Sequence, residues 1–211
     1  MNWLGVVALV SREPVFRSSL LLSGTVSTAQ VRLQLARWVR SGRLIQLRRG
    51  LYVLGPPWRK VEPHPFLMAN GLQPGSYVSQ QSALAFYGLI PEHVPVVTSV
   101  GPGRPETIHH PLGTFQFQHI AHRLLDGYSQ VDVAPTQQAF VAGPEKALLD
   151  LVYLTPHGDS EEYLQSLRLQ NLDTVRPQAL LTLAERSGTP RLIRAARRVV
   201  GMAAHDGGEP L

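Results

Sequence analysis

Residues 25–54, TVSTAQVRLQLARWVRSGRLIQLRRGLYVL, decide how the N-terminal part of this chain folds. Within them, large apolar side chains recur at the spacing of one helical face. These residues are Val31, Leu35, Trp38 and Val39. Spacing of this kind places the four side chains on one stripe of a helix, so the sequence predicts an amphipathic helix over residues 28–41.

The sequence also contains signals for the two ends of this helix and for the structure of the segment that follows it. Ser27 or Thr28 is placed to cap the first turn, because a short side-chain oxygen accepts from the free N–H groups there. Gly42 is placed to end the helix. The strand-forming residues on either side of Arg48-Arg49-Gly50 then predict a two-stranded hairpin over residues 44–54.

The helix face opposite the apolar stripe carries arginine and glutamine and no carboxylate. Arginine pairs with guanine or phosphate and glutamine with adenine, so this face is predicted to enter a DNA major groove. The predicted DNA-binding residues of the helix are Thr28, Gln30, Arg32, Leu33, Gln34, Arg37 and Arg40. For Leu33 two interpretations stay open, contact with a thymine methyl group and packing against a neighbouring element.

The hairpin turn adds Arg48 and Arg49, which are predicted to reach DNA phosphates beside the helix. A helix followed by a basic hairpin is typical of a winged helix-turn-helix. The alternative is a solvated basic helix beside an ordinary hairpin.

Charge is distributed unevenly along the 211 residues. Residues 1–60 hold ten lysines and arginines against one acidic residue, a formal charge of +9, and the remainder carries −4. This asymmetry suggests that the first part binds a polyanion and the second has another role.

Composition excludes several classes of protein. The chain has no cysteine, which excludes disulfides and cysteine-based zinc sites and suits a reducing compartment, so a cytoplasmic location is expected. No apolar run reaches the length of a membrane span, and no membrane partner is expected. The apolar N-terminus lacks a basic leader and a cleavage site, so a core helix is predicted there.

The predicted fold class is α+β, with a winged helix-turn-helix domain over residues 1–56 and an α+β domain over residues 57–211 that ends in helices. The first domain should contain a helix over residues 2–10 and a second that opens at Pro14 and ends at Gly24, before the DNA-binding helix. Gly55-Pro56-Pro57 should end that domain, with the boundary near residues 55–62.

The second domain alternates between short helical and strand patterns. Helices are predicted over residues 63–70, 80–87, 160–169, 177–187, 190–202 and from Pro144 onward. Strands are predicted over residues 76–78, 94–100, 114–120, 130–134 and 138–142. Residues 203–211 are expected to be frayed.

Histidines are the best candidates for catalysis or metal binding. His109 and His110 are adjacent, and His119, His122 and Asp126 follow. A hairpin would bring His109 near His119, but the spacing matches no known zinc site. Exposed or core histidines are favoured over a metal site, and no cofactor is expected.

Two further charged groups have open interpretations. Glu145 is expected to complement a helix dipole, with Lys146 exposed or ion-paired. Arg191, Arg194 and Arg198 share one face of the last helix. They are interpreted as a solvated face, as extra phosphate contacts or as a docking site for an acidic partner.

Three blocks of the chain resemble the AbiEi family, the antitoxins of type IV toxin–antitoxin systems. The first is SGRLIQLRRGLYVL at the end of the predicted helix and its hairpin. The others are SYVSQQSALAFYGLIPEHVPVVTSV (residues 76–100) and FVAGPEKALLDLVYL (residues 140–154). The blocks lie within residues 15–155, and the C-terminal helices match less clearly.

The resemblance implies an antitoxin that acts in phage defence. Such a protein represses its own operon by binding inverted repeats in double-stranded promoter DNA, and counteracts a nucleotidyltransferase-like toxin without needing a stable complex. Independently, the residues predict DNA binding and show no enzyme motif, so a non-enzymatic regulator is expected. The alternatives are a winged-helix regulator with a ligand-sensing C-terminal domain, an enzyme that uses the histidine region, and a nuclease subunit.

Overall fold

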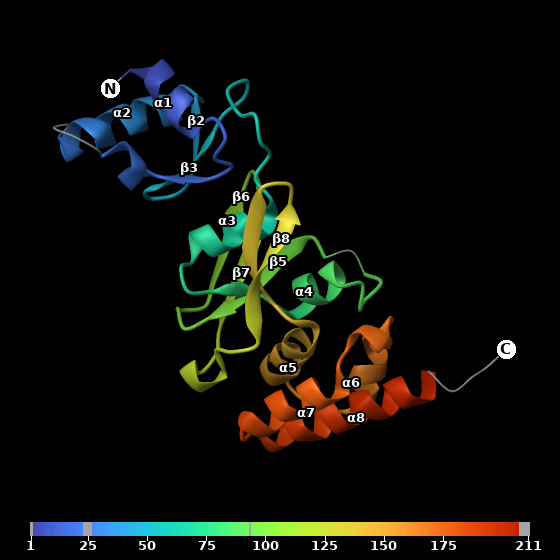
Figure 1. The fold of residues 1–211 in the computed structure, drawn as a ribbon. Coiled ribbons are helices and arrows are strands. Elements are labelled where there is room, and N and C mark those ends of the chain that lie inside the picture. The colour runs from blue at the N-terminus through green and yellow to red at the C-terminus, as the bar shows by residue number, and fades with distance from the viewer. Residues whose placement is uncertain (1, 23–26, 93, 207–211) are drawn as a thin grey trace. The chain divides into compact units, whose positions relative to one another are not determined.

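The computed structural model describes residues 2–22, 27–92 and 94–206 (Figure 1). Its elements divide into two compact units. Unit 1 consists of Met1–Pro74 and Asp132–Gln138, and unit 2 of Gly75–Val131 and Ala139–Leu211. Helices and strands occur in both, so the predicted α+β class is confirmed.

Unit 1 combines helices with a small antiparallel sheet whose strand order is β1-β3-β2. The elements in chain order are α1 (Trp3–Val10), β1 (Phe16–Arg17), a 3-10 turn (Ser18–Leu21), α2 (Thr28–Arg40), β2 (Leu44–Arg48), β3 (Leu51–Leu54) and α3 (Pro65–Leu72). Asn2 caps α1 by accepting a hydrogen bond from the backbone N–H of Gly5 at 2.7 Å.

The prediction of an α-helix that begins at Pro14 is wrong. Phe16 lies in β1 opposite Tyr52 of β3, and their two rings stack with centroids 5.9 Å apart. Ser18–Leu21 follow as a 3-10 turn. Pairing with a strand that lies far along the chain overrides the local helical spacing, because it satisfies the backbone and buries Phe16. The predicted end of this helix, Gly24, lies outside the described residues.

The core of unit 1 is built from the apolar faces of α1, α2 and the sheet. Trp38 of α2 lies at its centre, with the Trp3 ring edge-on at a centroid distance of 5.0 Å. Trp3 also meets Trp58 edge-on at 5.5 Å. These contacts hold α2 by its apolar side and leave its opposite face to solvent.

Unit 1 extends past the boundary predicted near residue 56. The Arg48 guanidinium donates to the Leu72 carbonyl at 2.9 Å, which ties α3 to the hairpin. Gln137 accepts from the His64 N–H at 2.8 Å and donates to the Glu62 carbonyl at 2.9 Å. These bonds explain why α3 and residues 132–138 belong to this unit.

A six-stranded mixed sheet, of strand order β6-β7-β5-β4-β9-β8, forms the framework of unit 2. The tip of its β8–β9 hairpin is the segment assigned to unit 1. The strands are β4 (Tyr77–Val78), β5 (Val96–Gly101), β6 (Glu106–His110), β7 (Gly113–His119), β8 (Tyr128–Ala134) and β9 (Gln137–Ala142). All but β6 are predicted from the sequence to within a few residues.

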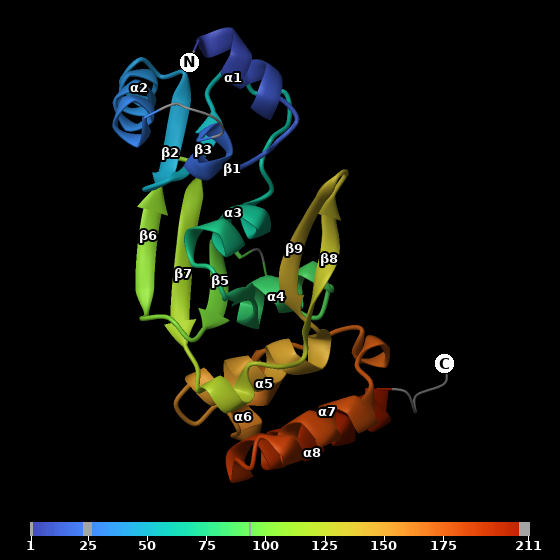
Figure 2. The same ribbon diagram turned by 60° about the vertical axis from the view of Figure 1, so that its left-hand side comes forward.

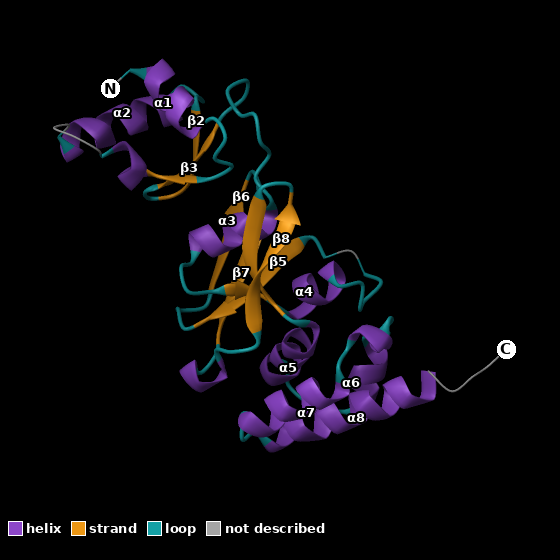
Figure 3. Ribbon diagram, viewed as in Figure 1, coloured by secondary structure: helices purple, strands orange, loops and turns teal. Residues whose placement is uncertain are grey.

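Helices complete unit 2, and every element after β9 is helical (Figure 3). They are α4 (Gln80–Phe86), α5 (Pro144–Leu154), α6 (Glu161–Ser166), α7 (Pro177–Arg186) and α8 (Pro190–Asp206), with 3-10 turns at His122–Leu124 and Leu172–Thr174. Helices α7 and α8 run side by side and pack against α5 (Figure 2). The predicted fraying from residue 203 is wrong as far as Asp206, and residues 207–211 lie outside the described part of the chain.

Candidate nucleic-acid interface

Helix α2 forms where its apolar stripe predicts. Val31, Leu35 and Trp38 are buried and Val39 is half-buried. Ser27 occupies the N-cap position, but its side chain makes no capping hydrogen bond. At the other end Gly42 adopts a φ of 71°, a left-handed conformation that glycine tolerates and that ends the helix as predicted.

The face predicted to bind DNA is the solvent-facing side of α2. Its exposed residues are Thr28, Gln30, Arg32, Leu33, Arg37 and Arg40, while Gln34 is half-buried. Leu33 is 56% exposed, so much of its side chain is accessible to solvent. Leu33 therefore provides an apolar group on an otherwise polar, basic surface.

The positive charge of this face is not offset by acidic residues of the same helix. Helix α2 contains no acidic residue, and its last turn carries Arg37 and Arg40. Among the described residues, none forms an ion pair with Arg32, Arg37 or Arg40. Three guanidinium groups without internal partners keep their hydrogen-bond donors available for an external anion.

The two arginines of the hairpin differ in their environment. Arg49 is exposed at the turn between β2 and β3. Arg48 ends β2 at an irregularity in the strand pairing and uses Nη1 for the bond to Leu72. This bond orients the Arg48 guanidinium toward the end of α3.

Arg17 and Arg43 are exposed arginines of unit 1 that lie outside the predicted DNA-binding set. Arg17 lies on β1 opposite Leu51. Arg43 follows the helix stop, and its Cζ atom lies 5.5 Å from the centre of the Trp3 ring, a cation–π distance. The strand pairing of Arg17 and the ring contact of Arg43 both depend on partners distant in sequence.

Unit 2 contains a buried polar cluster that is not part of this surface. Asp150 of α5 accepts hydrogen bonds from the Ser79 hydroxyl at 2.7 Å, the Tyr77 hydroxyl at 3.1 Å and the Lys146 ammonium. Burial raises the pKa of the Asp150 carboxyl, and burial together with the Asp150 charge raises the pKa of the Tyr77 hydroxyl. Of the two interpretations of Lys146, the ion-paired one is confirmed, and the pair is buried.

Glu145, the neighbour of Lys146, is buried at the first turn of α5. Its carboxylate accepts from the backbone N–H of Arg176 at 2.9 Å and from that residue's Nε at 3.0 Å. Burial acts to raise the pKa of Glu145, but the hydrogen bonds from Arg176 outweigh it and lower the pKa below its ordinary value.

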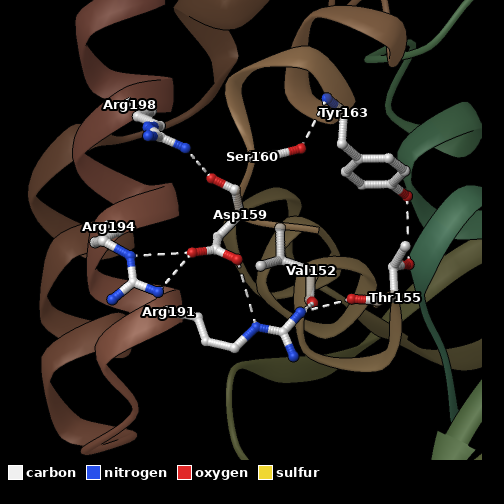
Figure 4. Close-up of polar contacts among 8 residues, drawn as sticks. All are labelled: Val152, Thr155, Asp159, Ser160, Tyr163, Arg191, Arg194 and Arg198. Atoms are coloured by element: carbon white, nitrogen blue, oxygen red, sulfur yellow. Dashed lines mark hydrogen bonds and ion pairs between the residues drawn. The ribbon is translucent and has the colours of Figure 1, made fainter. Parts of the chain in front are cut away.

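Three arginines of α8 form hydrogen bonds and ion pairs with other residues of the same chain (Figure 4). Arg194 donates to one oxygen of Asp159 from Nε at 3.0 Å and from Nη2 at 2.7 Å, while Arg191 Nε lies 3.6 Å from the other. Arg198 donates to the Asp159 backbone carbonyl.

Arg191 also closes the end of α5 by donating to the carbonyls of Val152 at 2.9 Å and Thr155 at 2.6 Å. Carbonyls at a helix C-terminus lack partners within the helix, so these bonds satisfy them. Arg194 and Arg198 are exposed, as the solvated interpretation expects, and Arg191 is half-buried. Arg191 and Arg194 both have their acidic partner, Asp159, within the chain.

The predicted approach of His109 to His119 is wrong. The β6–β7 hairpin forms, but it pairs His109 with Thr114. His119 lies five residues further along β7, roughly 17 Å away at the rise of an extended strand. Its Nδ1 atom contacts the carbonyls of Pro102 and Gly103, both at 3.2 Å. Over the described residues, no three histidine or acidic side chains gather in a metal-binding group.

Comparisons with known proteins add no assignment: no protein-family model matches the chain, and no curated protein matches its sequence. The AbiEi resemblance therefore rests on the quoted motifs alone. In the part of the chain that the structure describes, no helix combines the length and apolarity needed to cross a bilayer.

Proposed function

We propose that unit 1 binds double-stranded DNA as a winged helix-turn-helix, with α2 in the major groove. The observation that carries the proposal is the two-sided character of α2. One side is held in the core by Val31, Leu35 and Trp38, while the other exposes arginine and glutamine without a carboxylate. A helix that is anchored in this way presents base-contacting side chains on a rigid support.

The surroundings of α2 support the same proposal. A hairpin follows the helix at once and exposes Arg49 at its turn, and Arg17 and Arg43 add exposed positive charge in the same unit. Phosphate contacts position a protein on DNA, whereas contacts with base edges provide specificity. Arg48 and Arg49 take the first role in this proposal, and Gln30, Arg37 and Arg40 the second.

We further propose that the protein is an autorepressing antitoxin of the type IV class. This proposal is supported by the residue 76–100 and 140–154 motifs. Its DNA target is an inverted repeat in its own promoter, and its functional partner is a nucleotidyltransferase-like toxin. Two copies would occupy the two halves of such a repeat, because half-site symmetry requires one DNA-binding helix for each half.

Fluorescence anisotropy with the protein's own upstream DNA and a scrambled duplex, across a salt series, tests the DNA-binding proposal. The expected result is tighter binding to the native DNA, with affinity that falls steeply with salt as counterions are released. Equal affinity for the two duplexes would refute sequence-specific repression. No binding to either would refute the nucleic-acid interface itself.

A regulator whose second unit senses a small ligand is the competing proposal, and a charged cavity in unit 2 favours it. Co-expression with the toxin-like product of a neighbouring reading frame distinguishes the two. Rescue of growth by the full chain supports the antitoxin, whereas continued growth arrest alongside specific DNA binding supports the ligand-sensing regulator.

A further inference from the structure

A cavity of about 60 Å³ lies in unit 2, and the buried residue Lys146 is one of those that line it. It is enclosed by α5, the ends of α7 and α8 and the 3-10 turn at residues 122–124. Its polar lining residues are Arg123, Asp126, Lys146, Asp150, Arg186 and Ser187. A water molecule needs about 10–15 Å³ on this scale, so the cavity holds about four water-sized groups.

Lys146 reaches this cavity with unused hydrogen-bonding capacity. Its ammonium has three N–H donors. The described residues supply one hydrogen-bond acceptor, the Asp150 carboxylate, and the centre of the Tyr77 ring lies 5.8 Å away. A buried ammonium that lacks acceptors is costly, so the remaining donors require a polar group in the adjoining cavity.

Two arginines add donors to the same cavity. Arg123 is exposed and donates one N–H to the Ser187 carbonyl. Arg186 is exposed and lies 3.2 Å from Asp126, measured from Nη2 to Oδ2. Each guanidinium keeps further N–H groups for a bound group, in a planar arrangement that suits an oxyanion.

The charge balance also favours an anion. Three cations and two carboxylates line the cavity, a net formal charge of +1. Asp150 already accepts three hydrogen bonds, from Ser79, Tyr77 and Lys146. Asp126 opposes an anion, but its side chain is partly exposed to solvent and is paired with Arg186.

We propose that this cavity binds a phosphoryl group, with Lys146 at its buried end and Arg123 and Arg186 at its mouth. A phosphoryl group supplies several strong acceptor oxygens and occupies about the volume available, so it satisfies the donors that protein groups leave unused. Free phosphate and the phosphate of a nucleotide share this chemistry. The site is independent of DNA binding by unit 1.

Isothermal titration calorimetry of the full chain with sodium phosphate, against sodium chloride at equal ionic strength, is the direct test. Saturable binding of phosphate alone is expected. A second titration uses AMP on protein saturated with phosphate. Displacement by AMP would identify a nucleotide as the natural source, and absence of displacement would identify the free ion.

Substitutions of the cavity residues test whether phosphate binds in this cavity. Arg123→Gln and Arg186→Gln should each weaken phosphate binding about tenfold, the loss expected for one charge-assisted hydrogen bond. Arg197→Gln on α8 is the matched control, because its side chain is exposed and does not line the cavity. This control should bind phosphate as the wild type does.

A paired replacement tests Lys146 without leaving Asp150 as an isolated buried charge. Lys146→Met combined with Asp150→Asn keeps an acceptor for Ser79 and Tyr77 and should abolish phosphate binding, with circular dichroism confirming the fold. The proposal is overturned if the wild type shows no saturable binding, or if both cavity arginine variants bind normally. Loss of binding in Arg197→Gln would also overturn it, because the effect would then not depend on the residues that line the cavity.

Discussion

Lys146 and Asp150 lie one helical turn apart on α5 and form an ion pair inside unit 2, where both side chains are buried. Asp150 receives two further hydrogen bonds, from Ser79 and Tyr77. The pair therefore connects the start of α4 and strand β4 to α5. Its partners come from segments about 70 residues apart in the chain.

Lys146→Met should destabilise the protein by about 3–5 kcal/mol, because removal of one partner leaves the other as an unpaired buried charge. Urea unfolding followed by circular dichroism measures the loss. Arg194→Met, which removes the exposed member of a surface pair with Asp159, is the comparison and should cost much less. Equal losses for the two variants would show that burial does not decide the energy of these pairs.

Gly127→Ala should also destabilise unit 2, through the same lysine. Gly127 has a φ of +68°, and an added Cβ would lie 3.0 Å from the Cβ of Lys146. Gly188 is the matched control, since its φ is +63° and no atom lies within 4 Å of an added Cβ.

Gly188→Ala should therefore cost about 1–2 kcal/mol from backbone strain alone, and Gly127→Ala measurably more. Thermal unfolding of both variants separates the stability lost to the close contact with Lys146 from the stability lost to the left-handed backbone conformation. A loss for Gly127→Ala no larger than for Gly188→Ala would mean that Lys146 moves aside freely.

The Glu145–Arg176 contact should make stability depend on pH. Because the folded pKa of Glu145 is lowered from its ordinary value of 4.5, the unfolded chain takes up the proton first on acidification. The stabilisation is therefore complete above about pH 4.5 and is lost as pH falls through the folded pKa. The difference in unfolding free energy between wild type and Glu145→Gln should shrink over that range.

Urea unfolding at a series of pH values between about 3 and 7 measures this difference. Arg176→Gln removes the guanidinium from this contact but keeps the backbone N–H bond, so it should reduce the same pH dependence in part. An unchanged dependence in both variants would assign the acid sensitivity to other carboxylates.

Asp159→Asn should loosen the attachment of α8 to the α5–α6 connection. The substitution weakens the bonds to Arg191 and Arg194 and should cost about 1–2 kcal/mol. This loss is lower than that of a buried charged hydrogen bond, because the Arg194 side chain is largely exposed. Denaturant unfolding measures the loss. Asp173→Asn changes an exposed acid that makes no such contact with an arginine, and should have little effect. A similar loss for the two would exclude a special role for Asp159.

Arg37→Gln and Arg40→Gln should each reduce affinity for the native upstream DNA by about 1–3 kcal/mol if the side chain contacts a base. The loss for a scrambled duplex should then be smaller. Anisotropy titrations with both duplexes measure the two losses, with Arg197→Gln of unit 2 as the control. Unchanged affinity in both variants would rule out α2 as the DNA-binding helix, and an equal loss on both duplexes would indicate a phosphate contact only.

Local sequence patterns predicted many of the helices and strands correctly. The spacing of Val31, Leu35 and Trp38 predicted both the presence of α2 and the side that it buries, because a helix repeats every 3.6 residues regardless of distant contacts. Most strands of unit 2 were predicted in the same way. The helix expected after Pro14 failed because Phe16 pairs with Tyr52, a partner that no local pattern contains.

The partners of the charged side chains could not be predicted from the sequence of this protein. The sequence alone determined that α2 exposes arginines without acidic neighbours, since residue identity and helical period decide which side chains share a face. Only the tertiary structure decided which arginines stay available to a ligand. Arg191 and Arg194 are occupied by Asp159, and Lys146 is buried against Asp150, because the folded chain brings together groups whose separation in sequence is unrelated to their distance in space.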